Sequence, residues 1–501
     1  MAHGRLFFQN LPLCSKGINE ITGSWVYNKI RQRSYLIIFL EGFPLREYRV
    51  LSPTAILCYG FPEESFRAGL DRNPHLIAVD AGSTDPGPYY LGAGVSFTDR
   101  TAVKRDLELM IEAGLARDIP VVIGTAGGCG AEAHLQWSLE IILELAREKK
   151  WQFPLGIIHA ELSKEYILDA FRANKISPLH PAPELTETEI TATERIVGQM
   201  GPEAVIEVLA KGAKVVLAGR SYDPAVFSAA ALMAGFDKGL AIHMGKILEC
   251  GAIAASPGSG SDCLLGTLRE DCFIVEPLNP SRSCTTTSVA AHTLYEKTNP
   301  YILPGPGGIL DLSATTFSQE NERAVRVAGS KFIPSEKYTV KLEGAKRVGF
   351  RTVSIAGCRD PIMIGQIDHI VEAVRERVKD NFKRYGYAYF LHFNIYGKDG
   401  VMGKLEPQPQ PAITTHELGI IIEAVAETQE IANTICSFAR STMLHYGYPG
   451  RVATAGNLAF PYSPSDFKAG AVYNFNIYHL LQVDDPVALF PFEIIHAGEE
   501  K

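Results

Sequence analysis

The sequence predicts an α/β protein, with a larger N-terminal parallel-sheet domain followed by a ferredoxin-like α+β domain. From Tyr48 onward, strand-like and helix-like segments alternate. The strand-like segments are continuously apolar, as in strands buried on both faces of a parallel sheet. In the last third, the order of segments becomes strand, helix, strand, strand, helix, strand, which is the ferredoxin-like split motif.

Apolar periodicity sets the expected elements of the first domain. A continuous apolar run predicts a buried strand, and apolar residues at every third or fourth position predict a helix. The helical pattern is clear in Thr101–Ala116, where Val103, Leu107 and Met110 lie on one stripe. The expected strands are Arg49–Cys58, His75–Asp80, Ile119–Ile123, Leu155–Ala160 and Ala213–Ala218, and the other helices are Glu63–Asp71, Glu132–Lys149, Glu165–Asn174, one or two within Glu189–Ala210, and Ala225–Met233.

The segment Pro257–Ser313 is rich in glycine, proline, serine and threonine. Such a composition is typical of a linker. The apolar run Cys272–Val275 and the helical stretch Val289–Lys297 interrupt it, which favours a folded excursion over the sheet.

The last third supplies the six elements of the second domain. Its strands are expected at Arg351–Ala356, Tyr387–Tyr396, Leu418–Val425 and Val472–Val483, with helices at Ile362–Phe382 and Gln429–Tyr446.

Bulk properties narrow the class of protein. A chain of 501 residues suits two domains. The formal net charge of −8 argues against nucleic acid as a partner, because phosphate-binding surfaces are usually basic. No apolar run approaches the roughly 20 residues of a membrane helix, so we expect a soluble protein without a membrane partner.

The nine cysteines lack zinc-like spacing and are odd in number, which predicts free thiols in a reducing compartment. A cytoplasmic location fits this composition. The first 48 residues carry more basic than acidic side chains, so a mitochondrial presequence is the alternative to a poorly ordered start.

A glycine-rich turn follows the expected strand Ile119–Ile123 and precedes a helix. Bare backbone and the N–H groups of a helix N-terminus can bind an anion. Thr125, Gly127, Gly128 and Gly130 are therefore candidate substrate-binding residues for a phosphate or carboxylate. Close packing of the strand against its helix is the alternative explanation of the glycines.

Polar residues follow three other strands, at the edge where ligands of open α/β sheets bind. Asp80 directly ends one strand and is a candidate catalytic carboxyl, although turn formation also favours aspartate there. His159 and Glu161 share a strand face, so they could act as a base and its orienting group, as two metal ligands, or as an ordinary buried pair. Arg220 is a candidate for gripping an anionic substrate, and Asp223 is expected to cap the next helix.

A possible reactive cluster lies in the segment His243–Gly251. If this segment is helical, His243, Lys246 and Cys250 fall on one face. His243 would move a proton and Lys246 would stabilise an oxyanion. An amphipathic helix with a buried cysteine is the alternative.

The loop 456–466 has no regular pattern and could form a lid over the first domain, with Arg451 and Asn457 reaching the substrate, or a plain connection. The chain has no GxSxG elbow, HExxH helix or EF-hand loop. Metal binding and cofactors remain open.

Several of these segments, in order, resemble the acyclic terpene utilisation (AtuA-type) family. The resemblance rests on Asp80–Gly94, the glycine turn, His159–Glu161, Arg220–Pro224, His243–Gly251 and Asn457–Asp466. It begins near Tyr48 and leaves 1–47 as an extension outside the family match. It implies an α/β domain over 48–384 and a ferredoxin-like domain over 385–501, whereas the order of strands alone starts the second domain near residue 336.

The family context, the breakdown of branched acyclic terpenoids through acyl-CoA intermediates, implies small branched carboxylates or their thioesters as substrates. We expect an enzyme that performs acid/base chemistry next to a carbonyl, of the lyase or hydratase type, using His243, Lys246, Asp80, His159 and Glu161. A hydrolase with Cys250 as nucleophile and a non-catalytic binding or assembly subunit are the alternatives. A homo-oligomer is expected from the general behaviour of enzymes of this size.

Overall fold

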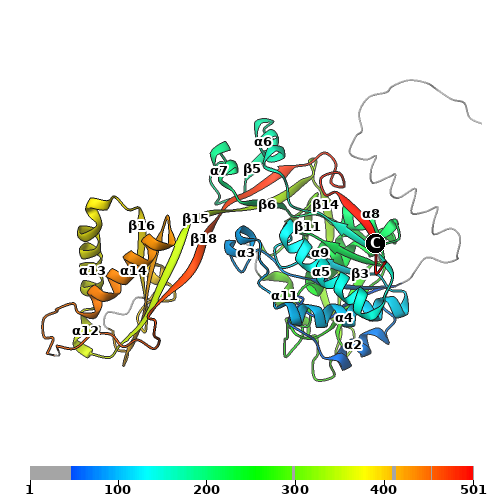
Figure 1. Ribbon diagram of the computed structural model, residues 1–501. Coiled ribbons are helices and arrows are strands. Elements are labelled where there is room, and N and C mark those ends of the chain that lie inside the picture. The colour runs from blue at the N-terminus through cyan, green and yellow to red at the C-terminus, as the bar shows by residue number, and fades with distance from the viewer. Residues whose placement is uncertain (1–46, 296–298, 409–412, 453, 500–501) are drawn as a thin grey trace, which may run out of the picture.

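The computed structural model describes residues 47–295, 299–408, 413–452 and 454–499. The predictions for the N-terminal extension fall almost wholly on residues outside these ranges. Two lobes are joined by a narrow neck, formed by the long strands β15 (Thr339–Cys358) and β18 (Asp466–Gln482) (Figure 1). Within the described ranges, every helix is too short or too polar to cross a bilayer.

The first lobe is built on a ten-stranded sheet with a parallel centre. The parallel strands, in spatial order, are β1 (Tyr48–Ser52), β2 (Leu76–Asp80), β3 (Val121–Gly124), β7 (Val215–Ala218) and β4 (Phe153–Ile158).

The prediction of a parallel sheet is wrong at both edges of this lobe. Antiparallel strands flank the centre because later parts of the chain return to it through hairpins and at the chain's end. One edge adds β8 (Leu264–Leu268), β9 (Cys272–Pro277), β13 (Val325–Ala328) and β12 (Thr316–Gln319), and the other adds β19 (Phe492–Ala497). The observed sheet is therefore mixed.

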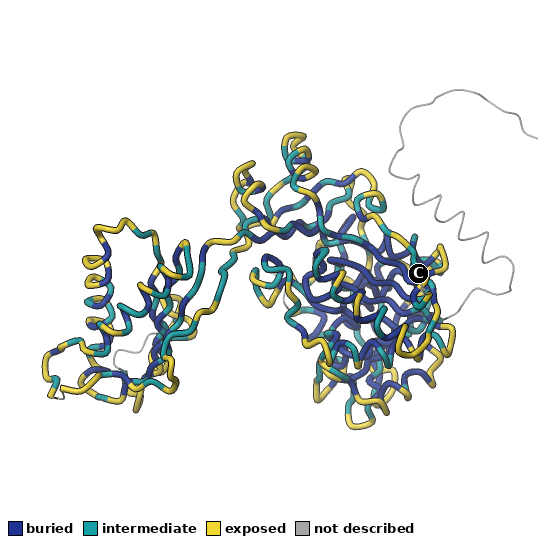
Figure 2. Tube along the Cα trace, in the orientation of Figure 1, coloured by how far each residue is buried: buried dark blue, intermediate teal, exposed yellow. Residues whose placement is uncertain are grey.

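Helices cover both faces of the sheet and enclose two apolar cores, which appear as dense dark blue in Figure 2. Neighbouring strand residues alternate between the cores: Val122 and Val216 face one, and Val121 and Val215 face the other. The first core lies under α8 (Pro202–Ala210), α9 (Asp223–Met233) and α10 (Lys238–Leu248), and the second under α2 (Glu63–Leu70), α4 (Arg100–Arg117) and α5 (Glu132–Lys149).

The segment Glu189–Ala210 was expected to hold one or two helices, and it contains parts of two together with an unexpected strand. It contains the strand β6 (Arg195–Gly198) between α7 (Glu187–Ala192) and α8. The strand forms because its backbone pairs with the distant β15, a partner that local periodicity does not reveal. The expected strand Arg49–Cys58 likewise ends at Ser52, directly before Pro53.

The glycine-rich segment Pro257–Ser313 is folded. It carries β8 and β9 of the large sheet and the helix α11 (Thr286–Leu294); residue 297, the expected end of this helix, lies outside the described ranges. It also begins a small sheet of β10 (Ile302–Gly305), β11 (Gly308–Asp311) and β14 (Lys331–Pro334).

The second lobe has the predicted order of elements. Its sheet runs β16 (Tyr389–Tyr396), β17 (Leu418–Ala426), β15, β18, with all neighbours antiparallel. A third apolar core lies between one face of this sheet and α12 (Pro361–Gly365), α13 (Ile367–Phe382) and α14 (Gln429–Leu444).

The neck strands belong to both lobes. At the first lobe, β15 pairs with β6 and β18 pairs with β5 (Ile176–Pro178), beside α6 (Lys164–Arg172). The short helix α3 (Pro88–Ala93) packs on the neck, where Gly92 leaves room for the ring of Tyr473. Each of the two neck strands, β15 and β18, thus runs from the first lobe into the sheet of the second.

Candidate active site

The candidate site lies where three neighbouring parallel strands end. β2, β3 and β7 are adjacent in the sheet, so Asp80, Thr125 and Arg220 come together at its carboxyl edge. This edge is where open α/β sheets bind ligands. Two of the three residues, Asp80 and Arg220, are charge-bearing side chains, and both are buried.

Arg220 is held by two carboxylates of the protein itself. Its Nε donates to Glu343 Oε2 at 2.7 Å, and its Nη1 donates to Asp223 Oδ1 at 3.1 Å. Arg220 and Glu343 are only 2% and 1% exposed. The guanidinium that the sequence suggested as a substrate grip is therefore engaged by a buried ion pair.

Glu343 lies on β15 and is the centre of this network. Besides Arg220, it accepts from Lys341 Nζ at 2.7 Å and from Thr84 Oγ1 at 3.0 Å. Burial by itself would raise the pKa of Glu343, but Arg220 and Lys341 outweigh burial and lower it to about 2. Glu343 is therefore ionised and joins the Asp80 turn, β7 and the neck.

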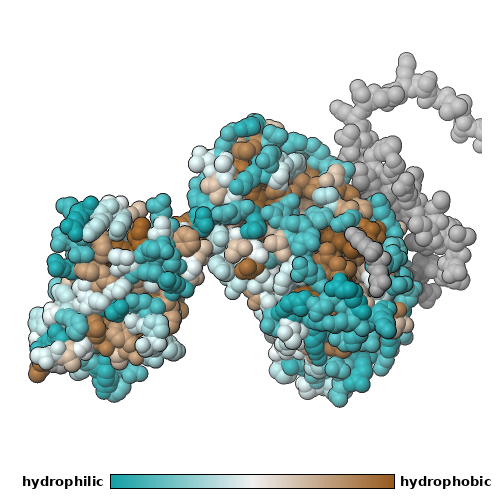
Figure 3. Space-filling view, in the orientation of Figure 1, coloured by the Kyte–Doolittle hydropathy of each residue, from teal (hydrophilic) through white to brown (hydrophobic). Residues whose placement is uncertain are grey.

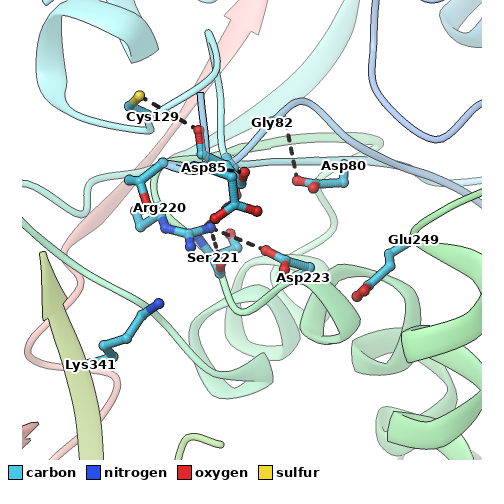
Figure 4. A network of polar contacts seen from close by, with 12 residues as sticks. Asp80, Gly82, Asp85, Cys129, Arg220, Ser221, Asp223, Glu249 and Lys341 are labelled. Carbon is cyan, nitrogen blue, oxygen red and sulfur yellow. Dashed lines mark hydrogen bonds and ion pairs between the residues drawn. The ribbon is translucent and has the colours of Figure 1, made fainter. Parts of the chain in front are cut away.

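Asp80 is held in the opposite protonation state. Burial, and next the charge of Asp223, raise its pKa well above the usual range, although Arg220 opposes this. Oδ1 accepts the N–H of Gly82 at 3.4 Å. Figure 4 shows the side chains of Asp80 and Asp223 directed toward Arg220, with Glu249 directed toward Asp223. The end of β2 thus places a buried carboxyl with a raised pKa near Asp223 on α9.

Asp223 does not cap α9, contrary to the prediction. Tyr222 is the N-cap residue, and Asp223 is the first residue inside the helix. From there its carboxylate faces Arg220 and still lies at the positive end of the helix dipole.

The glycine turn packs closely against its neighbours. A side chain at Gly130 would lie 2.1 Å from the backbone nitrogen of Arg220, and one at Gly128 would meet Phe97 at 2.7 Å. Gly127 and Gly128 also have positive φ values of 61° and 102°. Thr125 Oγ1 accepts from the backbone N–H of Ser221 at 3.3 Å. These contacts account for the glycines, and anion binding at the turn stays a prediction.

The N-terminus of α5, which follows the turn, binds a carboxylate of the chain. Glu161 Oε2 accepts the backbone N–H of Glu132 at 2.7 Å. His159 Nδ1 lies 2.8 Å from Glu132 Oε2, so His159 is oriented by Glu132 and not by Glu161. Burial raises the pKa of Glu161. His159 and Glu161 are thus linked through one intermediate residue, one strand beyond Arg220 in the sheet.

The residues predicted on α10 have separate partners. His243 is fully buried, with Nδ1 2.6 Å from Ser330 Oγ and Nε2 3.2 Å from Thr293 Oγ1. Burial, with a smaller contribution from Lys246, lowers its pKa to about 3. His243 is therefore neutral and enclosed by hydroxyl groups.

Lys246 lies in the last turn of α10, whereas Cys250 follows the end of the helix and so does not share its face with His243 as expected. Lys246 Nζ donates to Glu249 Oε1 at 2.5 Å, and Cys250 Sγ lies 3.5 Å from the hydroxyl of Tyr295. Burial, and next Glu249, raise the pKa of Cys250 to about 12. The thiol is thus protonated at neutral pH.

Most of the chain matches one known protein family. Residues 99–259 and 270–463 match the acyclic terpene utilisation family protein AtuA. The chain belongs to the AtuA family. Comparisons with curated proteins and with solved structures gave no match.

The AtuA match covers Arg220, Asp223, Glu249 and Glu343, whereas Asp80 and its turn precede the matched residues. Two of the network residues were missed in the sequence, Glu343 and Lys341, whereas Thr84 lies in the candidate turn that begins at Asp80. The sequence gives no local signal for Glu343, because the stretch Val340–Glu343 alternates apolar and charged residues, as in a strand with one face in solvent.

Asn457 lies inside the AtuA match but away from the network. Its Nδ2 donates to the carbonyls of Met443 and Tyr446 at the end of α14, and its loop pairs with β15 in the second lobe through Ala459 and Gly357. Within one chain this loop belongs to the second lobe and is separated from Arg220 by the neck (Figure 1).

Neither a metal cluster nor a disulfide is seen among the described residues. In those ranges, no three His, Cys, Asp or Glu side chains are arranged to hold a metal ion. The eight cysteines within the ranges are all free, and most are buried.

Proposed function

We propose that the chain is an enzyme of acyclic terpene utilisation that transfers a proton next to the carbonyl of a small carboxylate, branched ones included, or of its acyl-CoA thioester. The AtuA membership supports the metabolic context. One observation carries the chemistry: Asp80 is a buried carboxyl at the end of β2, and burial, followed by the charge of Asp223, raises its pKa well above the usual range. A neutral carboxylic acid at pH 7 can act as a general acid.

Asp223 and Arg220 would tune this acid. When Asp80 gives up its proton, a second negative charge forms in a buried site next to Asp223, so Asp80 regains a proton readily. The pair can therefore donate a proton to a substrate and take one back. Hydration and elimination both need these two steps, which supports a lyase or hydratase type of reaction.

The Arg220–Glu343 ion pair would position the pair of carboxyls. Glu343 holds the guanidinium through Nε, which leaves Nη1 facing Asp223. Glu343 also binds Thr84, in the turn that begins at Asp80. The network thereby fixes Asp223 and the Asp80 turn against one another, and Arg220 and Lys341 add positive charge near a developing enolate.

The two alternatives make different demands on the site. A hydrolase needs Cys250 as a thiolate, and a pKa near 12 disfavours this state at neutral pH. A non-catalytic assembly subunit would need no acid such as Asp80. The fold of the second lobe is compatible with such a subunit.

We also propose that the second lobe is a ferredoxin-like unit. The order strand, helix, strand, strand, helix, strand and the sheet order β16-β17-β15-β18 support this. A boundary near residue 336 keeps all six elements together, whereas a boundary near 385 divides them after the first helix. The first boundary is therefore the one we favour on topology.

Proton exchange in D2O tests the proposed chemistry without knowledge of the full reaction. The protein is incubated with a short branched 2-enoyl-CoA, its saturated thioester and the free acids, and deuterium uptake next to the carbonyl is followed by NMR. We expect uptake with the wild type and a loss of at least about 100-fold in Asp80→Asn, because the amide cannot donate or accept the proton.

Asp85→Asn is the matched control, since Asp85 is an exposed carboxyl in the same turn. It should keep wild-type exchange. Absence of exchange from the wild type with every compound, or undiminished exchange in Asp80→Asn, overturns the proposal. Release of free CoA that disappears in Cys250→Ser would instead establish the hydrolase.

A further inference from the structure

The described residues of the chain leave one sheet face of the second lobe uncovered. A hollow of about 810 Å³ lies on this face and continues onto the neck. It is lined on β15 by Arg347, Val348 and Arg351, and on β16 and β17 by Phe390, Glu423 and Val425. The helices of the second lobe cover the opposite face, where Ile420 and Ile422 are buried.

The neck has the same asymmetry. On one side, Tyr473 contacts α3 and lies 5.9 Å from the ring of Tyr89. Its neighbours Val472 and Asn474 line the hollow. The uncovered face therefore extends from the sheet onto the two-stranded neck, and such ribbons are marginally stable in water unless something packs on them.

The hollow exposes large apolar side chains. Phe390 is 58% exposed and Val348 is 40% exposed. In Figure 3, tan and brown residues gather where the neck enters the second lobe. Contiguous exposed apolar surface of this kind marks an interaction site.

The charges in the hollow indicate which partner fits. Its charged side chains are Arg347, Arg351, Glu423 and Glu427, so the two signs balance. Arg351 pairs with Glu423 at 2.6 Å. Within the described part of the chain, Arg347 and Glu427 have no ion-pair partner, and the Arg347 guanidinium lies over the ring of Phe350.

We infer that this hollow is the contact surface for a second copy of the chain, in a two-fold dimer where Arg347 of each copy meets Glu427 of the other. In a two-fold interface the same patch serves both subunits, so a patch with one unpaired cation and one unpaired anion at the same end complements itself. Nucleic acid or an anionic membrane would need an excess of positive charge, which this hollow lacks. The inference stands apart from the proposed enzyme function.

The mass of the full-length protein in solution, measured by light scattering and sedimentation velocity, tests this. We expect twice the mass of one chain for the wild type and the mass of one chain for Phe390→Asp, which places a charge in the apolar contact. Leu405→Asp is the matched control, because Leu405 is 81% exposed in the same lobe and outside the hollow.

Charge reversal tests the pairing itself. Arg347→Glu should weaken dimerisation by at least about 10-fold in Kd, and Arg347→Glu with Glu427→Arg should restore it, because the pair re-forms with its signs exchanged. A monomeric wild type overturns the inference. So does a Phe390→Asp protein that dimerises as tightly as Leu405→Asp, or a double variant that does not recover.

Discussion

The end of strand β2 and the first part of strand β15 each bury one carboxyl, and the pKa values of the two are shifted in opposite directions. Asp80 at the end of β2 keeps its proton, because burial and Asp223 both disfavour its charge. Glu343 on β15 is ionised, because Arg220 and Lys341 outweigh burial. Burial alone thus does not determine the protonation state of a group; the charge of its nearest neighbours does.

The two carboxyls therefore have different roles in the network. Glu343 is an ionised link that joins the turn after β2, β7 and the neck, and its loss should cost stability. Asp80 is a proton donor whose ionised form is disfavoured by burial and by Asp223. Its replacement by an amide should lower the activity and raise the stability of the folded protein. Variants at Glu343 and Asp80 test these two roles, and variants at His243 and His159 give the comparison outside the network.

Glu343→Gln should have the largest effect on stability. It leaves Arg220 and Lys341 buried or half-buried without their main counter-charge, and breaking a buried ion pair costs about 3–5 kcal/mol. Denaturant unfolding at pH 7 measures this. Glu336→Gln, at an exposed glutamate, is the control and should change the unfolding free energy by less than about 0.5 kcal/mol.

The pH dependence of Glu343→Gln adds a second readout. The folded pKa of about 2 lies below the unfolded value of about 4.3, so the wild type loses this stabilisation as pH falls from about 4.3 to about 2. The variant should lack this loss. An equal loss in both proteins would show that Glu343 is not the ionised link.

Asp80→Asn should stabilise the protein at pH 7, because burial and the charge of Asp223 disfavour the ionised form of Asp80. Above about pH 4 an unfolded chain releases the proton of Asp80, whereas the folded chain keeps it, so wild-type stability falls as pH rises. The amide has no proton to lose, so its stability advantage should grow as the pH rises from about 4 towards the folded pKa of Asp80. Thermal unfolding across that range measures this, and a variant less stable than the wild type throughout contradicts the assignment.

His243→Gln should destabilise the protein by about 1–2 kcal/mol at pH 8, because Ser330 and Thr293 lose their fitted partner. The folded pKa of about 3 lies below the unfolded value of about 6.5, so the wild type loses stability as pH falls through this window. The variant should not. His180→Gln, at an exposed histidine, should behave as the wild type.

His159→Ala should have the smallest effect. The His159–Glu132 contact is partly exposed, with side chains 28% and 44% accessible, and exposed ion pairs contribute less than about 1 kcal/mol. A double-mutant cycle with Glu132→Ala measures the coupling. A coupling above about 2 kcal/mol would place this pair with the buried network and not with the surface.

Local pattern was sufficient for most helices. The helix Glu132–Lys149 was predicted with the observed bounds, and Glu63–Asp71 and Thr101–Ala116 were within about one residue at each end. These helices have an apolar stripe that packs on the sheet, so their sequence carries the information for both helix and face. The order of elements in the second lobe was also readable for this reason.

The sequence did not predict strands whose pairing partner lies far away along the chain. β6 depends on β15, about 150 residues away in the chain, and β19 joins the sheet only because it pairs with β4. The beginning of β15 was missed for the same reason, and with it Glu343. The loop around Asn457 has no pattern that shows which lobe it joins, and its hydrogen bonds to α14 decide this.

The sequence by itself determined the alternation of strands and helices, the strand before and the helix after the glycine turn, and the polar residues after β2, β3 and β7, because each depends on neighbours a few residues apart. Only the tertiary structure decided that Arg220 binds Glu343 and that Asp80 lies beside Asp223. Protonation depends on the charges within a few ångströms, and those charges come from parts of the chain that folding alone brings together.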